Sequence, residues 1–187
     1  MLTDKILLGK CLKYAFISII FSFMLMALAL YAKEFDSNIS GPQMIVEPDT
    51  IRLGIARLKD TNIVFRGKVF QPEDSVFIIL TGVKKDDKIM DIPIADGDVD
   101  KNGNFTASVS ILVKVNQLLR AKIGSNENME TVIIISQPPI PEGVYTVKAI
   151  SMESDIKAEC KLLVKGPSVL DSIKDWIGGL LGKIVRK

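Results

Sequence analysis

Residues 75–81 read Ser-Val-Phe-Ile-Ile-Leu-Thr, a nearly continuous apolar run with the length of one strand. Such a run is typical of a strand with neighbours on both sides, so we expect it to lie centrally in a sheet. It belongs to residues 44–165, where Gly, Pro, Asn and Asp interrupt short apolar stretches about every 8 to 12 residues. This spacing predicts an all-β fold, an antiparallel sandwich of about eight or nine strands.

Alternating apolar residues predict strands on either side of this run. The alternating positions before it are Ile51, Leu53 and Ile55, followed by Ile63, Phe65 and Val69 around Gly67. Alternation places successive side chains on opposite faces, so each of these segments is expected to be a half-buried strand. After the run, Ile89, Ile92 and Ile94 predict a further strand. Pro93 assigns that strand to a sheet edge, because proline cannot donate to the hydrogen-bond ladder.

Turn residues delimit the later strands. Asn102-Gly103 is a hairpin signal, since both residues tolerate positive φ. The positions that alternate after this turn are Phe105, Ala107, Val109 and Ile111. Residues 113–124 instead keep apolar positions at helical spacing, which predicts a short helix or a crossing connection. The last strands are expected at residues 131–136, 144–150 and 156–164.

Several strand and turn phrases resemble those of bacterial immunoglobulin-like or fibronectin-III-like extracytoplasmic domains. They are Phe65-Arg66-Gly67-Lys68-Val69, Pro72-Glu73-Asp74-Ser75-Val76, Asp100-Lys101-Asn102-Gly103-Asn104-Phe105 and Pro141-Glu142-Gly143-Val144-Tyr145-Thr146-Val147. The resemblance implies an immunoglobulin-like β-sandwich and no particular ligand. Residues 50–82 are also similar to an uncharacterised family of membrane-anchored bacterial proteins found alongside sulfite or sulfonate exporter permeases.

The N-terminal residues 1–32 have the composition of an export signal. Lys5, Lys10 and Lys13 precede an uncharged apolar run at residues 14–32. The positive-inside rule assigns the lysine-bearing end to the cytoplasm and the remaining chain to the outside. Two forms stay open: a signal peptide cleaved near Ala27-Leu28-Ala29, or an uncleaved signal anchor that crosses the bilayer as a helix. Residues 33–43 are rich in turn formers and are expected to be a linker.

The composition excludes several classes of function. The chain has 187 residues and no histidine, which rules out Ser-His-Asp, Cys-His and histidine-metal chemistry. The 24 Lys and Arg nearly balance the 22 Asp and Glu, so no basic surface for nucleic acid is indicated. We expect no enzymatic activity and no cofactor, and no small-molecule substrate is evident.

A possible metal site lies in the acidic loop at residues 98–103. Asp98, Asp100 and Asn102 precede Gly103 and resemble the opening of a calcium loop. The twelfth position, which needs a bidentate glutamate, is Val109. We therefore expect a plain β-turn with no metal, and these three residues are the weak calcium candidate.

Residues 166–187 predict an amphipathic helix after the last strand. Ser168 has the position of an N-cap, and Asp171 lies in the first turn. The apolar face, expected to contact a membrane or a partner, comprises Val169, Leu170, Ile173, Trp176, Ile177, Leu180, Leu181 and Ile184. Three surfaces stay open for it: the membrane interface, a partner protein or second copy, and the protein's own sandwich.

These patterns together favour a non-enzymatic, membrane-anchored binding or scaffolding module, as an accessory subunit of an envelope or membrane complex. Its expected segments are an anchor or signal (1–32), a linker (33–43), the immunoglobulin-like sandwich (44–165) and the amphipathic helix (166–187). The C-terminal domain is expected to be periplasmic or extracellular. The alternative is a secreted, self-assembling structural protein of a surface layer or matrix, from which the signal is cleaved.

Overall fold

The computed structural model describes residues 34–85 and 88–186. The chain divides into two compact units, Met1–Glu34 and Phe35–Lys187, and the description below concerns the second. The anchor or signal predicted at residues 1–32 lies outside the described residues. Among the described residues, no helix is both long enough and apolar enough to cross a membrane.

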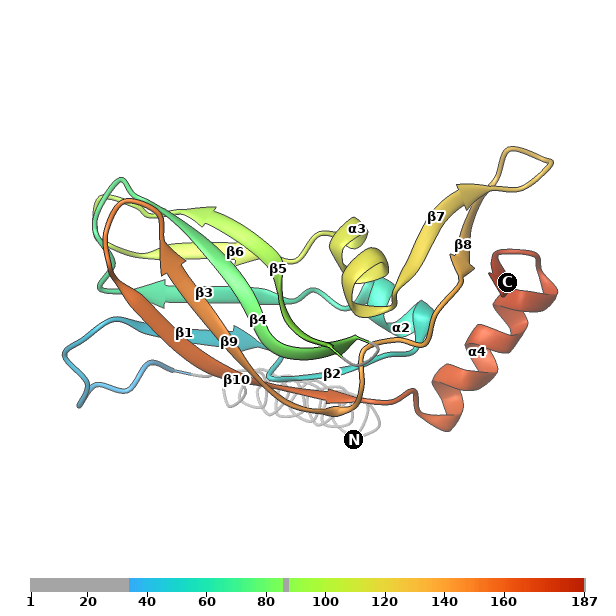
Figure 1. Cartoon of the computed structure of the whole chain (residues 1–187), viewed down its shortest axis with the longest axis horizontal. Helices are drawn as coiled ribbons and strands as arrows, with labels where there is room; N and C mark the ends of the chain where they lie inside the picture. Colours follow the sequence, from blue (N-terminus) through green and yellow to red (C-terminus); the bar gives the residue numbers. More distant parts are fainter. Residues whose placement is uncertain (1–33, 86–87, 187) are drawn as a thin grey trace, which may run out of the picture. The chain divides into compact units, whose positions relative to one another are not determined.

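Three β-sheets make up most of the regular secondary structure of the second unit (Figure 1). The first sheet has the order β1-β3-β6, with β1 (Gln43–Glu47), β3 (Val64–Lys68) and β6 (Phe105–Ser108) antiparallel. The second has the order β2-β10-β9-β4-β5, comprising β2 (Thr50–Arg52), β4 (Ser75–Lys85), β5 (Lys88–Asp98), β9 (Gly143–Ser151) and β10 (Lys157–Lys165). The third has the order β11-β8-β7, comprising β7 (Ala121–Ser125), β8 (Thr131–Ile135) and β11 (Ile184–Arg186).

Two of the strand pairs are parallel, so the predicted all-antiparallel pairing is wrong. β2 runs parallel to β10, and β11 runs parallel to β8. The chain passes from β1 to β2 through Pro48 and Asp49 alone and changes sheet there. The fold is therefore β-rich, with one antiparallel and two mixed sheets and few helices.

The first and second sheets share one apolar core. Strand β4 illustrates how the core is built, because Val76, Ile78 and Leu80 are completely buried while the intervening Phe77 is 44 % exposed. Its central place is confirmed, since β4 pairs with β9 on one side and β5 on the other. Each buried side chain of this size stabilises the fold by about 1.5–3 kcal/mol relative to an exposed one.

Several sequence predictions are confirmed. β5 lies at the edge of its sheet and carries Pro93. Strands β8, β9 and β10 lie where the turn spacing predicts them. The predicted short helix is present as α3 (Ile111–Val113) followed by the π-helical turn η1 (Lys114–Leu118).

Other strand boundaries are corrected by the structure. Ile55 begins the helix α2 (Ile55–Asp60), and Ile111 begins α3 after its N-cap Ser110, so neither belongs to a strand. In each case a side chain caps the start of a helical segment: Asp175 accepts from the Ile55 N–H, and Ser110 accepts from the Val113 N–H. Val69 lies just beyond β3 at φ 65°. The helical spacing predicted to residue 124 also fails, because residues from Ala121 onward form β7.

The turn at residues 100–104 forms as predicted, but it does not close a hairpin within one sheet. Gly103 has φ 77°, and its N–H donates to the Asp100 carbonyl at 3.0 Å. β5 and β6 belong to different sheets and are joined at the turn by a bridge between Val99 and Phe105. The turn therefore carries the chain from one sheet to the other.

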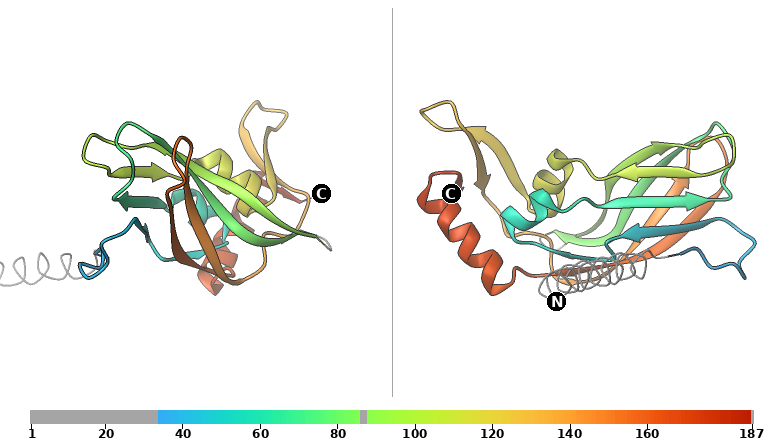
Figure 2. Two further views of the ribbon diagram at one scale, coloured as in Figure 1. Left: turned by 60° about the vertical axis from the view of Figure 1, so that its left-hand side comes forward. Right: turned by 180° about the vertical axis from the view of Figure 1, so that it is seen from behind.

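The third sheet, α2 and the C-terminal helix α4 (Val169–Leu180) gather at one end of the second unit, beyond the ends of the first and second sheets (Figures 1 and 2). This end contains the predicted contact helix and so contains the candidate functional site.

Candidate functional site

Helix α4 begins where the sequence predicts, with a complete capping box. The Ser168 Oγ accepts from the Asp171 N–H at 3.2 Å, and the Asp171 Oδ2 accepts from the Ser168 N–H at 2.9 Å. These pairs satisfy two helix-terminal donors that would otherwise lack partners. Hydrogen bonding from the Ser168 side chain, then from its backbone, lowers the pKa of the Asp171 carboxyl below its ordinary value.

The helix is shorter than the predicted segment 166–187. It ends at Leu180, and Gly182 at φ 69° turns the chain into β11. A positive φ is tolerated there because glycine lacks a Cβ. Ile184 therefore belongs to a strand and is partly buried against the core, so it does not continue the apolar face of the helix.

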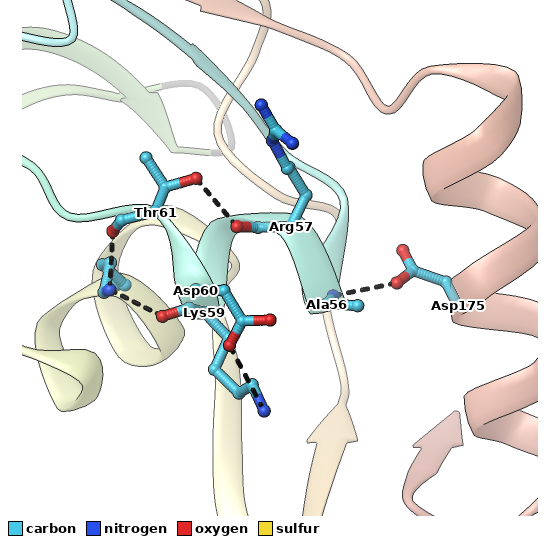
Figure 3. Close-up of polar contacts among 7 residues, drawn as sticks. Ala56, Arg57, Lys59, Asp60, Thr61 and Asp175 are labelled. Carbon is cyan, nitrogen blue, oxygen red and sulfur yellow. Dashed lines mark hydrogen bonds and ion pairs between the residues drawn. The ribbon is translucent and has the colours of Figure 1, made fainter. Parts of the chain in front are cut away.

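The polar side of α4 is the side that docks on the protein. Asp175 Oδ2 accepts from the Ile55 N–H at 2.9 Å. Its Oδ1 accepts from the Ala56 N–H at 3.0 Å (Figure 3). Both carboxyl oxygens thus cap the start of α2, where the first N–H groups have no helical partner. Asp171 and Asp175 are only 5 % and 8 % exposed. Gly54 permits the close approach, because a Cβ there would lie 2.6 Å from the Asp171 Cβ.

The other end of α2 is held by η1. Lys114 Nζ donates to the carbonyls of Lys59 at 2.8 Å and Thr61 at 2.9 Å (Figure 3). Burial lowers the pKa of Lys114, while the nearby charge of Asp60 acts in the opposite direction. α2 is therefore fixed between η1 and α4, and it fixes the rotation of α4 about its own axis.

That rotation turns the apolar side of α4 outward. Successive residues differ by about 100° around a helix, so Val169 and Ile173, each two positions from Asp171, lie roughly opposite it. The α4 apolar face, as defined here, consists of Val169, Leu170, Ile173, Trp176, Ile177, Leu180 and Leu181. These side chains are between 43 % and 79 % exposed. The protein's own β-sheets, one of the three surfaces considered from the sequence, do not cover this face.

The exposed charges of α4 and of the described residues that follow it are of one sign. Both acidic residues of the helix are buried on its inner side. The exposed Lys174 lies on the helix, and the exposed Lys183 and Arg186 follow it. A surface that meets this face therefore meets apolar side chains with positive charges nearby.

The weak calcium candidate forms a turn that uses its own carboxylate. Asp100 Oδ1 accepts from the N–H groups of Asn102 and Asn104, each at 2.8 Å. The Asn104 backbone bond is the main cause that lowers the Asp100 pKa, partly offset by burial. Asp98 instead accepts from Ser75 Oγ at 2.9 Å. In residues 34–85 and 88–186 no group of three or more His, Cys, Asp or Glu could hold a metal ion.

Sequence reasoning missed the role of the two aspartates of α4. It assigned Asp171 to the helix start, correctly, but it gave no docking role to the side of the helix that carries both acids. No local signal reveals the docking, because the partners of Asp175 lie 119 and 120 positions earlier in the chain.

Comparisons with known proteins add little to this geometry. No protein-family model matches the chain, and no curated protein matches it. Two crystal structures of a β-glucosidase from Listeria innocua, one with gluconolactone and one with isofagomine, share 12 % sequence identity with it. The matches cover 67 % and 68 % of this chain at TM-scores of 0.34 and 0.35. The chain spans 16 % of the length of that enzyme, and likeness at this level shows no activity.

Proposed function

We propose that this protein is a non-enzymatic, membrane-anchored extracytoplasmic module, and that the α4 apolar face rests on the bilayer that holds the N-terminal anchor. The observation that carries this proposal is the orientation of α4, whose carboxylates are buried and whose apolar side faces outward. Removal of that face from water would contribute about 25 cal/mol of free energy for each Å² of apolar surface buried. A helix fixed in this orientation needs an apolar surface opposite it.

The chemistry of the face favours a lipid interface over a protein groove. Trp176 is amphipathic and 65 % exposed, which suits the boundary between headgroups and acyl chains. Lys174, Lys183 and Arg186 can contact anionic headgroups, as the basic residues of in-plane membrane helices do. Helix α4 has 12 residues, too few to span a hydrocarbon core of about 30 Å. We therefore propose that it lies in the plane of the membrane.

The anchor at residues 1–32 supports the same placement. Its lysines and its uncharged run favour a single pass with the remaining chain outside the cytoplasm. The β-rich unit, periplasmic or extracellular, then has two attachments, one through the anchor and one through α4. Two attachments limit the orientations of the unit, which suits an accessory subunit that positions another component.

We further propose that the first and second sheets form an immunoglobulin-like sandwich. The order β10-β9-β4-β5 corresponds to the G-F-C-C′ order of such domains, and β1-β3-β6 to their A-B-E strands. Tyr145, near the start of β9, donates from its hydroxyl to the Pro141 carbonyl at 2.7 Å, as the tyrosine corner of these domains does. In this interpretation the third sheet and α4 are additions to the sandwich, and these additions make the membrane contact.

Fluorescence of the full chain in liposomes tests the membrane contact, because Trp176 is the chain's one tryptophan. With anionic phosphatidylglycerol present, its emission should shift to shorter wavelength, and lipids brominated on their acyl chains should quench it. Ile173→Asn with Ile177→Asn should abolish that quenching, since both changes lie on the α4 apolar face. Val144→Asn, a change at an exposed apolar residue of β9, should leave it intact.

The same samples separate the membrane proposal from the alternative. Strong iodide quenching in the presence of lipid, without bromolipid quenching, would overturn the membrane contact. A blue shift that grows with the protein-to-lipid ratio would instead favour pairing of two α4 faces, as expected of a self-assembling secreted protein. The intact mass of the native protein decides the anchor: Met1 retained in the membrane fraction supports it, and a start after Ala29 or Ala32 in the soluble fraction supports secretion.

A further inference from the structure

A second surface lies away from the α4 apolar face, between two sheet edges. A groove with a volume of about 860 Å³ separates β5 from β7, and we call it the β5–β7 groove. Met90, Asp91, Ile92 and Pro93 line it from β5, and Ala121, Lys122 and Ile123 line it from β7. Asn116 and Gln117 of η1 also line it, as do Val83 and Lys85 of β4 and Ser136 and Gln137 after β8.

The groove lies beside two strands that are the last in their sheets. Four consecutive residues of β5 and three of β7 line it, and Val83 and Lys85 of β4 line it as well. β5 is the last strand of the five-stranded sheet and β7 the last of the third sheet. In the described part of the chain, neither strand pairs on its outer side.

The chemistry of the groove is apolar and cationic. Met90, Leu112 and Ile123 are between 38 % and 55 % exposed although they are large and apolar. Among the described residues that line it, Lys85, Arg120 and Lys122 carry positive charges and Asp91 carries a carboxylate. Asp91 Oδ1 already accepts from the Gly82 N–H at 2.9 Å.

We propose that the β5–β7 groove binds an extended acidic and apolar segment of a partner protein, which adds to the third sheet as a strand beside β7. Open strand edges bind extended peptides through main-chain hydrogen bonds, and side-chain pockets on alternate residues give specificity. β7 is the pairing edge because β5 carries Pro93, which has no N–H to donate. Met90 and Ile123 contact the apolar side chains of the segment, and Lys85 and Lys122 pair with its carboxylates.

If the protein is a membrane-attached module, as proposed above, this groove identifies the kind of partner that it binds. Binding in the groove does not depend on the α4 apolar face. Strand addition also explains why the third sheet leaves Ile123 exposed at its edge. A fourth strand would cover that side chain and satisfy the free backbone groups of β7.

The test uses the full chain in lipid nanodiscs and a fluorescent peptide of about nine residues, the length of an ordinary strand. The peptide alternates Val with Glu, and binding is followed by fluorescence anisotropy with empty nanodiscs subtracted. We expect a dissociation constant below about 100 µM and at least about tenfold weaker binding of the Val-Lys peptide. Lys122→Glu should weaken the Val-Glu peptide to a similar extent. Lys101→Glu, at the exposed turn after β5, is the matched control and should leave affinity unchanged.

Backbone pairing is tested by two N-methylated peptides, one blocked at the Val positions and one at the Glu positions. Alternate N–H groups of a strand point to opposite sides, so one peptide should lose binding and the other should retain it. Absence of Val-Glu binding, equal effects of the two methylation patterns, or equal effects of Lys122→Glu and Lys101→Glu would each overturn the proposal. A peptide-free dimer that Lys122→Glu dissociates would also overturn it, by assigning the groove to a second copy. None of these outcomes changes the Trp176 fluorescence that tests the membrane contact.

Discussion

Asp175→Ala should weaken the docking of α4 on α2, and the structure gives the size of the effect. The variant removes the acceptor for two N–H groups, those of Ile55 and Ala56, at the start of α2. Loss of a capping acceptor costs about 1 kcal/mol for each donor, so about 2 kcal/mol is lost in docking. Alanine is a better helix former than aspartate by about 0.6 kcal/mol. The net loss is about 1.5 kcal/mol, and its origin is docking rather than helix formation.

Hydrogen exchange of backbone amides measures this loss directly. About 1.5 kcal/mol corresponds to roughly a tenfold loss of protection, concentrated at the amides of Ile55 and Ala56. Lys174→Ala is the matched control, because it changes a neighbouring exposed residue of the same helix. Unchanged protection of both amides in Asp175→Ala, or an equal loss in Lys174→Ala, would refute the conclusion that carboxylate capping holds α4 in place.

Three further changes test the packing that supports this end of the unit and the fold. Gly54→Ala should destabilise the protein by about 1–3 kcal/mol in chemical denaturation, since the new Cβ would lie 2.6 Å from the Asp171 Cβ; wild-type stability would contradict the close approach. Lys114→Met should cost about 1–3 kcal/mol, because two carbonyls at the end of α2 lose their donor, and unchanged thermal unfolding would argue against that role. Asp74 accepts from Ser151 Oγ, the main cause of its lowered pKa. Its contribution to stability is therefore full above the unfolded carboxyl pKa of about 4 and is lost as pH falls through its lower folded value. In Asp74→Asn the free energy of unfolding should fall less steeply than in the wild type as the pH is lowered below about 4. An equally steep fall would contradict the stabilising role of the Asp74 carboxylate.

The orientation of α4 also bears on how amphipathic helices are interpreted. An apolar stripe on a C-terminal helix ordinarily indicates the side that packs on the core. In this protein the stripe faces outward and two buried carboxylates hold the opposite side. The stripe predicts that an apolar surface covers it. It does not distinguish the protein's own core from a membrane or a partner protein.

Much of the fold is predictable because its causes are local in the chain. Alternating or continuous apolar residues predict β3 and β4, and Pro93 predicts that β5 is an edge strand. Asn102-Gly103 predicts a turn, which forms with Gly103 at positive φ. Parallel pairing of β2 with β10 could not be predicted, because it depends on where a short strand meets the last one.

The sequence by itself determined that a helix begins after Ser168 and that its apolar residues form one face, because capping and helical period act within a few residues. Only the tertiary structure decided which side of that helix is buried. The deciding contact joins Asp175 to the backbone of Ile55, 120 positions away. A short-range pattern holds no information about such a partner. The same holds for the β5–β7 groove, whose two edges become neighbours only when β5 and β7 are brought together by folding.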